Sequence, residues 1–278
     1  MYMIEGEIRT FRHGNNDPQR IKQADIRKGF GASSAFPIKD YPELVAKVAT
    51  LGFKNRGYFL LYRGQPEDFY ASRGSEHSVS LYPSIFRSDK VKNISYSKEW
   101  KRRWQDLKEK TKQLLDRYPQ ETGDQREALR YLLRNEELCW AILQHYEKCL
   151  TPYLDLTHSL RVAASFATQN STNGYVYVFG MPYPHGTISH YIDQDIVLIH
   201  LQSACHPSAK RPHFQEGWLA GSYYLNPDDD NRAKQNFSRR LLAKFHINNA
   251  GRFWSKEFPR LPDKALKPGD DKDFSWVL

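Results

Sequence analysis

The sequence predicts an α+β fold, because apolar runs typical of buried strands and longer amphipathic stretches typical of helices occupy different parts of the chain. Helical periodicity dominates between residues 97 and 148, and strand-like runs dominate after Cys149. With 278 residues, of which 40% are hydrophobic and 14% aromatic, the chain can bury a full core. We expect one main domain at residues 36–250, an N-terminal arm at 1–35 and a C-terminal tail at 251–278.

The chain should begin with an unpatterned segment and a first helix. Residues 1–35 show no clear periodicity and end in small residues, so an arm or loosely docked segment is expected. Asp40 and Pro42 give the cap and first-turn signals of a helix that Gly52 would end. The apolar face of this helix would consist of Leu44, Val45, Val48 and Leu51.

A strand and a long loop should follow this helix. The run at residues 58–62 (Tyr-Phe-Leu-Leu-Tyr) is closed by Gly64 and Pro66, and it is far too short for an ordinary helix. Residues 72–80 are polar and predict a loop, and residues 81–87 are again apolar with a proline inside. A long loop beside a candidate site often carries function.

Two helices and three strands are predicted in the rest of the chain. The helices fall at about 97–117 and 124–148, with apolar positions at Leu107, Leu114, Leu115, Leu129, Leu132, Leu133 and Leu138. The charged run 98–103 fits either a solvated helix face or a surface for nucleic acid or another partner. The strands are expected at 175–179, 196–199 and about 214–220.

Charge and cysteine content narrow the possible functions. The chain has 41 Lys and Arg against 32 acidic residues, a net charge of +9 and a pI near 9.3, which favours nucleic acid or an acidic protein as partner. Three cysteines without CxxC spacing predict neither a disulfide framework nor a zinc site, and they fit the reducing cytoplasm. No apolar run approaches the ~20 residues of a membrane span, and no signal peptide is evident, so we expect a cytoplasmic protein without a membrane partner.

Several common functional motifs are absent from the sequence. There is no GxGxxG, no phosphate loop of the GxxxxGKS type, no HExxH and no GxSxG. We therefore expect no bound metal, no Rossmann or phosphate-loop nucleotide site and no serine hydrolase elbow.

Arg63 is the first candidate for a site residue. It follows the predicted strand, and its planar guanidinium matches a pair of phosphate oxygens at the strand end where open sheets place ligands. Gly64 would let a ligand approach the backbone closely. The alternative for an isolated Arg-Gly pair is a surface arginine before a tight turn.

Four groups of residues occur in an order typical of one family. They are the segment 62–65 (Tyr-Arg-Gly-Gln), the segment 81–87, the block from Leu143-Gln144-His145-Tyr146 through 151–157 to 163–167, and Arg211 with Gln215 and Gly217. Over roughly residues 57–247, with a helical insertion at about 89–125, the chain resembles the FRG domain family, named for a Phe-Arg-Gly segment that here reads Tyr-Arg-Gly. It departs from the family pattern at Glu147, where glycine is usual, and at Pro152, where arginine is usual.

A more distant resemblance suggests a chemistry. A strand ending in Arg-Gly, then a hydroxyl-bearing segment before a helix, then a late strand with Gln or Glu is similar to the Arg-Ser-Glu class of ADP-ribosyltransferases. The resemblance implies a split β-sheet core with flanking helices, and NAD as substrate. It implies that Arg63 grips the dinucleotide, that Asp155-Leu156-Thr157 stands at the hydroxyl segment, and that Gln215 or Glu216 takes the late position.

The two candidates for the late position exclude each other. Adjacent strand residues face opposite sides, so Gln215 and Glu216 cannot both enter one pocket without a bulge. The family pattern favours Gln215, which leaves the usual glutamate missing. Either Asp155 then supplies the negative charge that stabilises a cationic sugar, or Gln215 and His145 polarise a substrate group.

The remaining candidates have both a functional and a structural interpretation. A neutral His145 could accept a proton or bind a ribose, or it could tie a helix end to the sheet. Tyr146 and Tyr153 could stack on nicotinamide, or they could belong to the core. Arg211 could bind phosphate or an acidic neighbour, and Gln65 adjoins the Arg-Gly pair.

These resemblances imply an NAD-dependent ADP-ribosyltransferase toxin that modifies a macromolecule, with RNA or DNA favoured as acceptor by the basic charge. The setting would be a toxin–antitoxin or phage-defence system, with an antitoxin protein as partner. Two alternatives remain open at this point. One is a noncatalytic FRG module that binds a nucleotide, nucleic acid or protein, and the other is an NAD glycohydrolase or nuclease on the same scaffold.

Overall fold

The computed structural model describes residues 1, 4, 7–12, 14–22, 35–73, 76–87, 96–117, 134–205, 209–223, 225 and 232–268. Within these ranges the helices are α2 (Tyr41–Lys54), α3 (Tyr96–Arg117), α5 (Glu136–His145), α6 (Leu160–Ala167), α7 (Leu201–Ala204), α8 (Lys210–Phe214), α9 (Ala250–Phe253) and α10 (Asp263–Leu266), with 3₁₀ turns at Ser84–Phe86, Ile192–Gln194, Arg232–Gln235 and Phe237–Arg240. None of the described helices is long and apolar enough to cross a membrane.

The described strands form one large sheet and two small hairpins. They are β1 (Glu7–Thr10), β2 (Gln19–Lys22), β3 (Phe36–Ile38), β4 (Phe59–Gln65), β5 (Tyr70–Arg73), β6 (Glu76–Val79), β7 (Leu154–Thr157), β8 (Gly174–Met181), β9 (Ile188–Tyr191), β10 (Ile196–His200), β11 (Gly217–Gly221) and β12 (Leu241–Ile247). The eight-stranded sheet has the order β3-β12-β8-β4-β7-β11-β10-β9, antiparallel except for the β3–β12 pair. The α+β prediction is confirmed.

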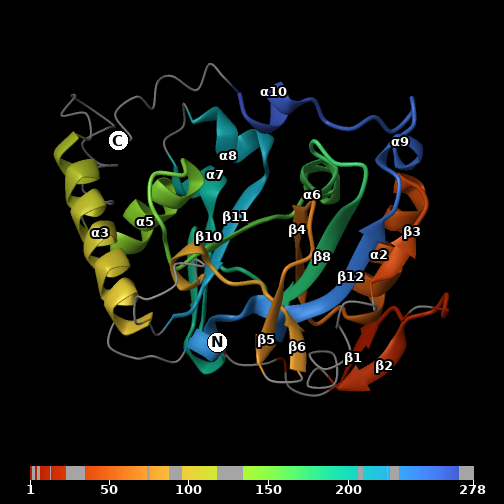
Figure 1. The fold of residues 1–278 in the computed structure, drawn as a ribbon, viewed down its shortest axis with the longest axis horizontal. Helices are drawn as coiled ribbons and strands as arrows, with labels where there is room; N and C mark the ends of the chain where they lie inside the picture. Colours follow the sequence, from red (N-terminus) through yellow and green to blue (C-terminus); the bar gives the residue numbers. More distant parts are fainter. Residues whose placement is uncertain are drawn as a thin grey trace.

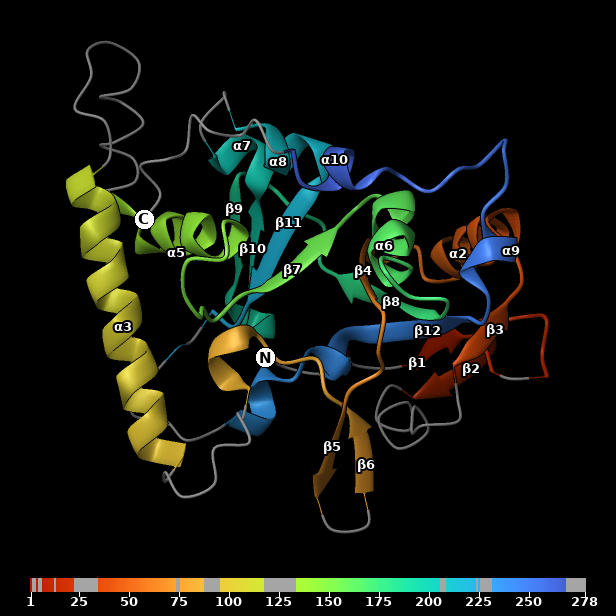
Figure 2. The same cartoon turned by 45° about the horizontal axis from the view of Figure 1, so that its top comes forward.

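The sheet has a weak seam between β4 and β7. β4 pairs with β8 along its whole length, from Phe59 to Gln65, but it pairs with β7 only at Tyr62 and Thr157. The two strands diverge on either side of this contact, and Figure 2 shows β7 crossing toward α6 at an angle to β4. The seam therefore divides the sheet into a β3-β12-β8-β4 half and a β7-β11-β10-β9 half.

Two hydrophobic clusters hold the layers together. Alternate residues of β10 serve different clusters, because successive strand side chains point to opposite faces: Ile196 and Leu198 join a cluster with α2 and α6, and Val197 and Ile199 join one with α3 and α5. Figure 1 shows α3 and α5 at one end of the molecule and α2 with β3 at the other. The seam and its surroundings lie between them.

The first predicted helix and strand are present with extended boundaries. Asp40 caps α2 by accepting a hydrogen bond from the backbone N–H of Glu43 at 2.8 Å, and the helix continues two residues past Gly52 to Lys54, with Asn55 as its C-cap. β4 includes the predicted run but continues to Gln65, so Arg63 lies inside the strand rather than after it.

Other predictions need correction. Residues 72–80 belong largely to the β5–β6 hairpin rather than to a loop, and β11 begins at Gly217, so Gln215 and Glu216 precede the strand. The helices α3 and α5 fit the predicted ranges, whereas Leu129, Leu132, Leu133 and most of the insertion outside α3 lie beyond the described residues.

The described part of the N-terminal segment is packed, in contrast to the loose arm that its sequence predicts. Ile8 and Phe11 are buried, and the Phe11 ring lies 5.3 Å from that of Phe36 and 5.9 Å from that of Phe245. The side-chain amide of Asn55 accepts a hydrogen bond from the backbone N–H of Arg9 on β1 and donates one to its backbone oxygen, each at 2.9 Å. Sparse apolar residues, which show no period in the sequence, are enough to dock this hairpin because each reaches the core.

Candidate functional site at the seam of the sheet

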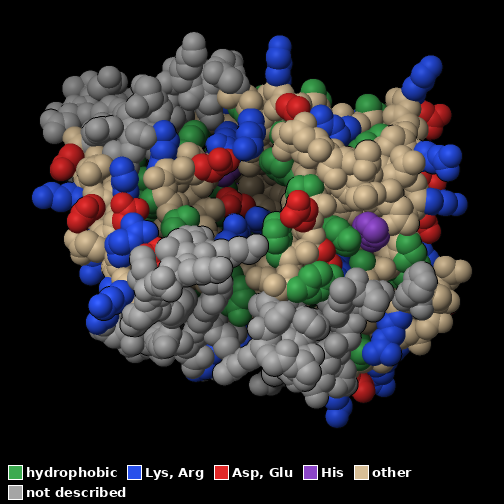
Figure 3. All heavy atoms as spheres, viewed as in Figure 1, with side chains coloured by type: hydrophobic (Ala, Val, Ile, Leu, Met, Phe, Trp, Pro, Cys, Tyr) green, Lys and Arg blue, Asp and Glu red, His purple; other side chains and the backbone are tan. Residues whose placement is uncertain are grey.

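A pocket opens where β4 and β7 diverge, and residues of α5, α6 and α8 surround it. It encloses about 200 Å³. Figure 3 shows the hollow near the centre of this face, with basic and acidic side chains around it. The lining residues are Tyr62, Arg63, Gly64, Gln144, His145, Glu147, Asp155, Leu156, Thr157, Val162, Phe166, Arg211, Gln215 and Lys267.

Gly64 has a packing role that the sequence interpretation missed. A Cβ at Gly64 would lie 1.7 Å from the backbone oxygen of Ala163, so no side chain fits between β4 and α6. Gly174 on β8 has the same relation to Ala167, at 2.2 Å. The glycine was expected to admit a ligand, but it is the helix backbone that approaches. α6 is thereby held close enough for Val162 and Phe166 to form a wall of the pocket.

Arg63 reaches across the seam. Its Nη1 donates to the backbone oxygen of Asp155 on β7 at 2.7 Å, and its Nε faces Gln65 Oε1 at 3.4 Å. Its Nη2 has no hydrogen-bond partner among the described residues. Burial lowers the pKa of the guanidinium, and the carboxylate of Asp155 opposes this. Arg63 is therefore a largely desolvated cation with one donor group still available.

Asp155 lies opposite Arg63 and is oriented by a polar chain. Gln144 Nε2 donates to Asp155 Oδ2 at 2.5 Å, and Gln144 Oε1 accepts from the hydroxyl of Thr151 at 2.5 Å. Burial raises the pKa of Asp155, while Arg63 and the Gln144 hydrogen bond oppose the rise. The pocket thus contains a carboxyl group whose proton affinity is increased, near a partly buried cation that opposes the increase.

His145 is buried at the end of α5 and borders the same pocket. Burial, followed by the positive charge of Arg211, lowers the pKa of its imidazole to about 3. Its Nε2 has no hydrogen-bond partner in the described part of the chain. An imidazole with so low a pKa is a poor general base at neutral pH, so the expected proton-accepting role is not favoured. It remains a neutral hydrogen-bonding group beside the pocket.

Gln215 and Glu216 lie just before β11, and their side chains have different surroundings. Gln215 borders the pocket, and its Nε2 donates to the backbone oxygen of Leu266 at 2.6 Å. Glu216 has a φ of +46° and pairs with His158 Nε2 at 3.0 Å, outside the pocket lining. Thr157 Oγ1 donates to the backbone oxygen of Gln215 at 2.7 Å and so joins β7 to this turn. Gln215 is the inward residue of the two, as the family pattern implies.

A cluster of charged side chains also borders the pocket. Arg211 Nη2 donates to Glu147 Oε1 at 2.6 Å, and Lys267 Nζ contacts the same oxygen at 3.1 Å. The guanidinium of Arg211 also lies 6.0 Å from the centre of the Tyr146 ring. Lys267 comes from the C-terminal tail, which packs along α6 through the Ser165 hydroxyl and Arg161.

Besides Glu216, three other residues that were predicted from the sequence do not border the pocket. Tyr153 is fully buried in the α3–α5 cluster, where its ring would meet any side chain at Gly221, so it cannot stack on a ligand. Gln65 donates to the hydroxyl of Tyr177 at 3.1 Å and supports Arg63 from behind. Tyr146 packs beside Arg211 rather than in the lining.

Sequence reasoning missed several lining residues. Gln144 stands next to His145 in the resemblance block, and Glu147 marks a departure from the family pattern, so both carried a signal. Lys267 carried none, because only folding brings the tail to the pocket. The described residues contain no cluster of His, Cys, Asp and Glu suited to a metal ion.

Fold and pocket together define an α+β domain with a buried, charged pocket at a seam of its sheet. Residues 60–175 match the family model of the FRG domain. Comparisons with curated proteins and with solved structures found no match. The matched region includes Arg63, His145, Asp155 and Thr157, whereas Arg211, Gln215 and Lys267 come from beyond it.

Proposed function

We propose that the pocket binds NAD and that the protein transfers ADP-ribose from it to a macromolecule. One observation carries the proposal. Arg63, Thr157 and Gln215 lie far apart in the sequence and come from the three segments of the ADP-ribosyltransferase resemblance, and all three border one pocket. The divergence of β4 and β7 at this place further supports the likeness to a split sheet.

The size of the pocket suggests how NAD would lie. Ligand pockets for drug-sized molecules span about 300–1,000 Å³, so the 200 Å³ enclosed here would hold only part of a dinucleotide. In this proposal nicotinamide and its ribose enter, and the pyrophosphate stays near the mouth. The open Nη2 of Arg63 then donates to a phosphate oxygen, since guanidinium is well suited to phosphate.

The transfer step uses few groups. The bond between nicotinamide and C1 of the ribose breaks with its electron pair on nicotinamide, which leaves a cationic sugar. Asp155 would stabilise this cation in a partly desolvated site, where charge interactions are strong. An oxygen or nitrogen of the acceptor then bonds to C1 and releases its proton to Asp155 or to solvent. His145 and Gln215 would orient the ribose and amide groups.

A noncatalytic module remains the second candidate, because Glu216 faces His158 rather than the pocket. Without that glutamate, catalysis depends on Asp155, whose pKa burial raises. A pocket that binds a nucleotide without cleaving it would need only Arg63 and its neighbours. NAD hydrolysis without an acceptor is the further possibility that the experiment below separates.

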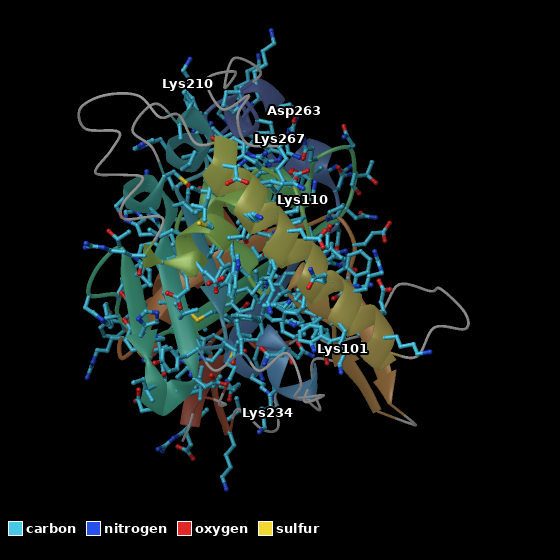
Figure 4. All side chains as sticks on the ribbon, turned by 90° about the vertical axis from the view of Figure 1, so that its left-hand side faces the viewer. Lys101, Lys110, Lys210, Lys234, Asp263 and Lys267 are labelled. Atoms are coloured by element: carbon cyan, nitrogen blue, oxygen red, sulfur yellow. The ribbon has the colours of Figure 1, made fainter. Side chains whose placement is uncertain are left out.

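RNA or DNA is the acceptor that the basic charge favours, and an antitoxin partner follows from the family's resemblance to toxin and phage-defence components. Figure 4 shows Lys101 and Lys110 along α3, the helix that carries the charged run. Part of that run is structural, because Glu99 binds Arg102 and Arg103, and buried Arg103 donates to the backbone oxygen of Ile85 at 3.0 Å. A surface that binds a nucleic-acid acceptor would therefore have to include basic residues outside this run.

Substituting Arg63 tests the proposal. We expect Arg63→Ala to weaken NAD binding about 10- to 100-fold, since a charge-assisted hydrogen bond contributes about 1.5–3 kcal/mol. The NAD affinity of Arg63→Lys should lie between those of wild type and Arg63→Ala, because lysine keeps the charge but lacks the planar guanidinium. The control is Arg252→Ala, an exposed residue on α9 outside the pocket lining. Titration calorimetry and NAD-dependent thermal shifts measure these effects, and circular dichroism checks that each variant is folded.

The proposal fails if millimolar NAD neither shifts the melting temperature nor gives a heat signal, or if folded Arg63→Ala binds NAD as wild type does. If NAD binds, incubation with adenine-labelled NAD and RNA, DNA or cell extract identifies the reaction. Label on a macromolecule indicates transfer, free ADP-ribose indicates hydrolysis, and intact NAD indicates a binding module.

A further inference from the structure

Glu147 has a backbone conformation that glycine adopts far more easily. Its φ is +57°, just after the end of α5, and it occupies the left-handed position of a helix-ending motif. The N–H of Lys148 donates to the oxygen of Leu143, and the N–H of Glu147 donates to that of Gln144, each at 2.9 Å. This double hydrogen bond is the Schellman pattern, in which glycine is the usual residue at this position. A glutamate here is disfavoured by its own Cβ.

The side chain of Glu147 points at two cations. Its Oε1 accepts from Arg211 Nη2 at 2.6 Å and from Lys267 Nζ at 3.1 Å. Burial would raise its pKa, but the hydrogen bonds from Arg211 and Lys267 outweigh this and lower the pKa below its ordinary value. Glu147 is therefore an anion at neutral pH. Figure 4 shows Lys267 beside α10, at the same end of the molecule as Lys210 on α8.

Stability does not explain this arrangement. The Glu147 side chain is 62% exposed, that of Lys267 is 49% exposed and that of Arg211 is 17% exposed, and an ion pair whose carboxylate is exposed contributes little to stability. The left-handed backbone subtracts from that contribution. A glycine would complete the helix end without strain, so the carboxylate has to be accounted for by its surroundings.

Those surroundings are the pocket itself. Glu147, Arg211 and Lys267 border the same cavity as Arg63. His145, 3% exposed, also borders it with a ring nitrogen that has no partner among the described residues. A carboxylate held by two cations in a ligand pocket occupies the place that an anionic ligand group would take.

We propose that Arg211 and Lys267 form a second anion subsite, which binds a phosphoryl group of the ligand, and that Glu147 occupies this subsite until the phosphoryl group displaces it. The identification of the ligand as NAD rests on the proposed function, whereas the subsite itself requires only a phosphoryl anion. Arg63 and the Arg211–Lys267 pair would then each bind a phosphate of the ligand in the same pocket. Glu147 acts as an internal competitor that lowers affinity and excludes weaker anions.

The test measures binding of ADP and of NAD to the full chain by calorimetry. Removing the competing charge in Glu147→Gln should tighten ADP binding about 3- to 10-fold, the range of a modest ion pair lost from the competing state. Glu147→Gly should also tighten ADP binding, and glycine adopts the left-handed backbone conformation at this position without strain. Glu257→Gln, an exposed acid outside the pocket lining, makes the same change in net charge and should leave ADP affinity unchanged. Arg211→Ala combined with Glu147→Gln should abolish the gain.

The outcomes separate this inference from the proposed function. Tighter ADP binding in both Glu147 variants, lost with Arg211→Ala, supports the subsite even if NAD does not bind. Unchanged or weaker ADP binding in both folded variants overturns the subsite, and NAD binding that still depends on Arg63 would leave the proposed function intact. Equal tightening in Glu257→Gln would overturn it too, because the effect would then be one of net charge. Absence of ADP binding in every variant also overturns it.

Discussion

The imidazole of His145 is buried beside Arg211, and both conditions oppose its protonation. The neutral ring is thus the form that fits the pocket. A charged ring would be desolvated and would face a guanidinium. Protonation therefore has to be coupled to unfolding or to a large rearrangement of this region.

This coupling predicts a pH dependence of stability. The ordinary pKa of 6.5 falls to about 3 in the folded protein, so between these values the unfolded chain binds a proton that the folded chain does not. Above pH 6.5 this difference in proton binding is absent, and the free energy of unfolding has its full value. As the pH falls from 6.5 toward 3, the free energy of unfolding decreases by up to about 1.4 kcal/mol per pH unit. Urea unfolding between pH 4 and 7 should show a smaller pH slope for His145→Gln than for wild type.

The matched control is His213→Gln on α8, where the side chain is exposed. Equal slopes for wild type and His145→Gln would show that His145 is protonated in the folded protein or accessible to water. The same result would remove the argument against a proton-accepting role for this histidine.

Among the elements, α6 and β4 have the most demanding contact. We expect Gly64→Ala to destabilise the protein by more than about 4 kcal/mol, because its Cβ would lie 1.7 Å from a backbone oxygen that cannot move without shifting α6. Gly57→Ala is the control, since a Cβ there meets nothing within 4 Å, and it should change stability by less than about 0.5 kcal/mol. Thermal or urea unfolding measures both.

A Gly64→Ala variant with near-native stability would mean that α6 can retreat from the sheet. In that case the Val162 and Phe166 wall would not be fixed, and the pocket volume would depend on the position of this helix. The contact would then be a poor guide to the shape of the site.

Elements with strong local patterns could be predicted from the sequence. α2 has a cap, a first-turn proline and an apolar face, and β8 and β10 are continuous apolar runs. The β5–β6 hairpin could not, because its residues are polar and its strands pair with each other rather than with the core sheet. β7 is only four residues long, so its sequence carries a motif but no strand pattern.

The residues of the site likewise divide into those that the sequence could predict and those that it could not. Arg63, His145, Asp155, Thr157, Arg211 and Gln215 could be selected by residue type and order, and all border the pocket. Tyr153 and Glu216 could not be rejected, since the direction of a side chain depends on neighbours that are remote in sequence. The same holds for Lys267, which reaches the pocket from the tail.

At the scale of the whole molecule, a buried polar network ties the segment after β4 to two other strands. Lys244 on β12 donates to Asp68 Oδ2 at 2.6 Å, and Tyr177 on β8 donates to Asp68 Oδ1 at 2.6 Å. The side chains of Lys244 and Asp68 are 0% and 5% exposed. Burial lowers the pKa of Lys244, and the Asp68 carboxylate opposes this. Gln65 connects Tyr177 to Arg63, so the network ends at the pocket.

Removing one partner of this pair should be far worse than removing both. Asp68→Ala would leave the Lys244 charge buried without its carboxylate, which typically costs about 3–5 kcal/mol. Asp68→Leu combined with Lys244→Met should recover most of this, because an apolar pair of similar size needs no desolvation of charge. Urea unfolding of the single and double variants measures the difference. A double variant no more stable than Asp68→Ala would point to the tyrosine hydrogen bonds as the important part of the network.

The seam between β4 and β7 has a consequence for the sheet as a whole. One residue pair and the Arg63 side chain join the two halves at this point. Any ligand held by Arg63 on one half and by Asp155 or Gln215 on the other would act as a cross-link between them. By thermodynamic linkage, such a ligand must strengthen the cohesion of the two halves, and substitutions that loosen the seam must weaken its binding to the same extent.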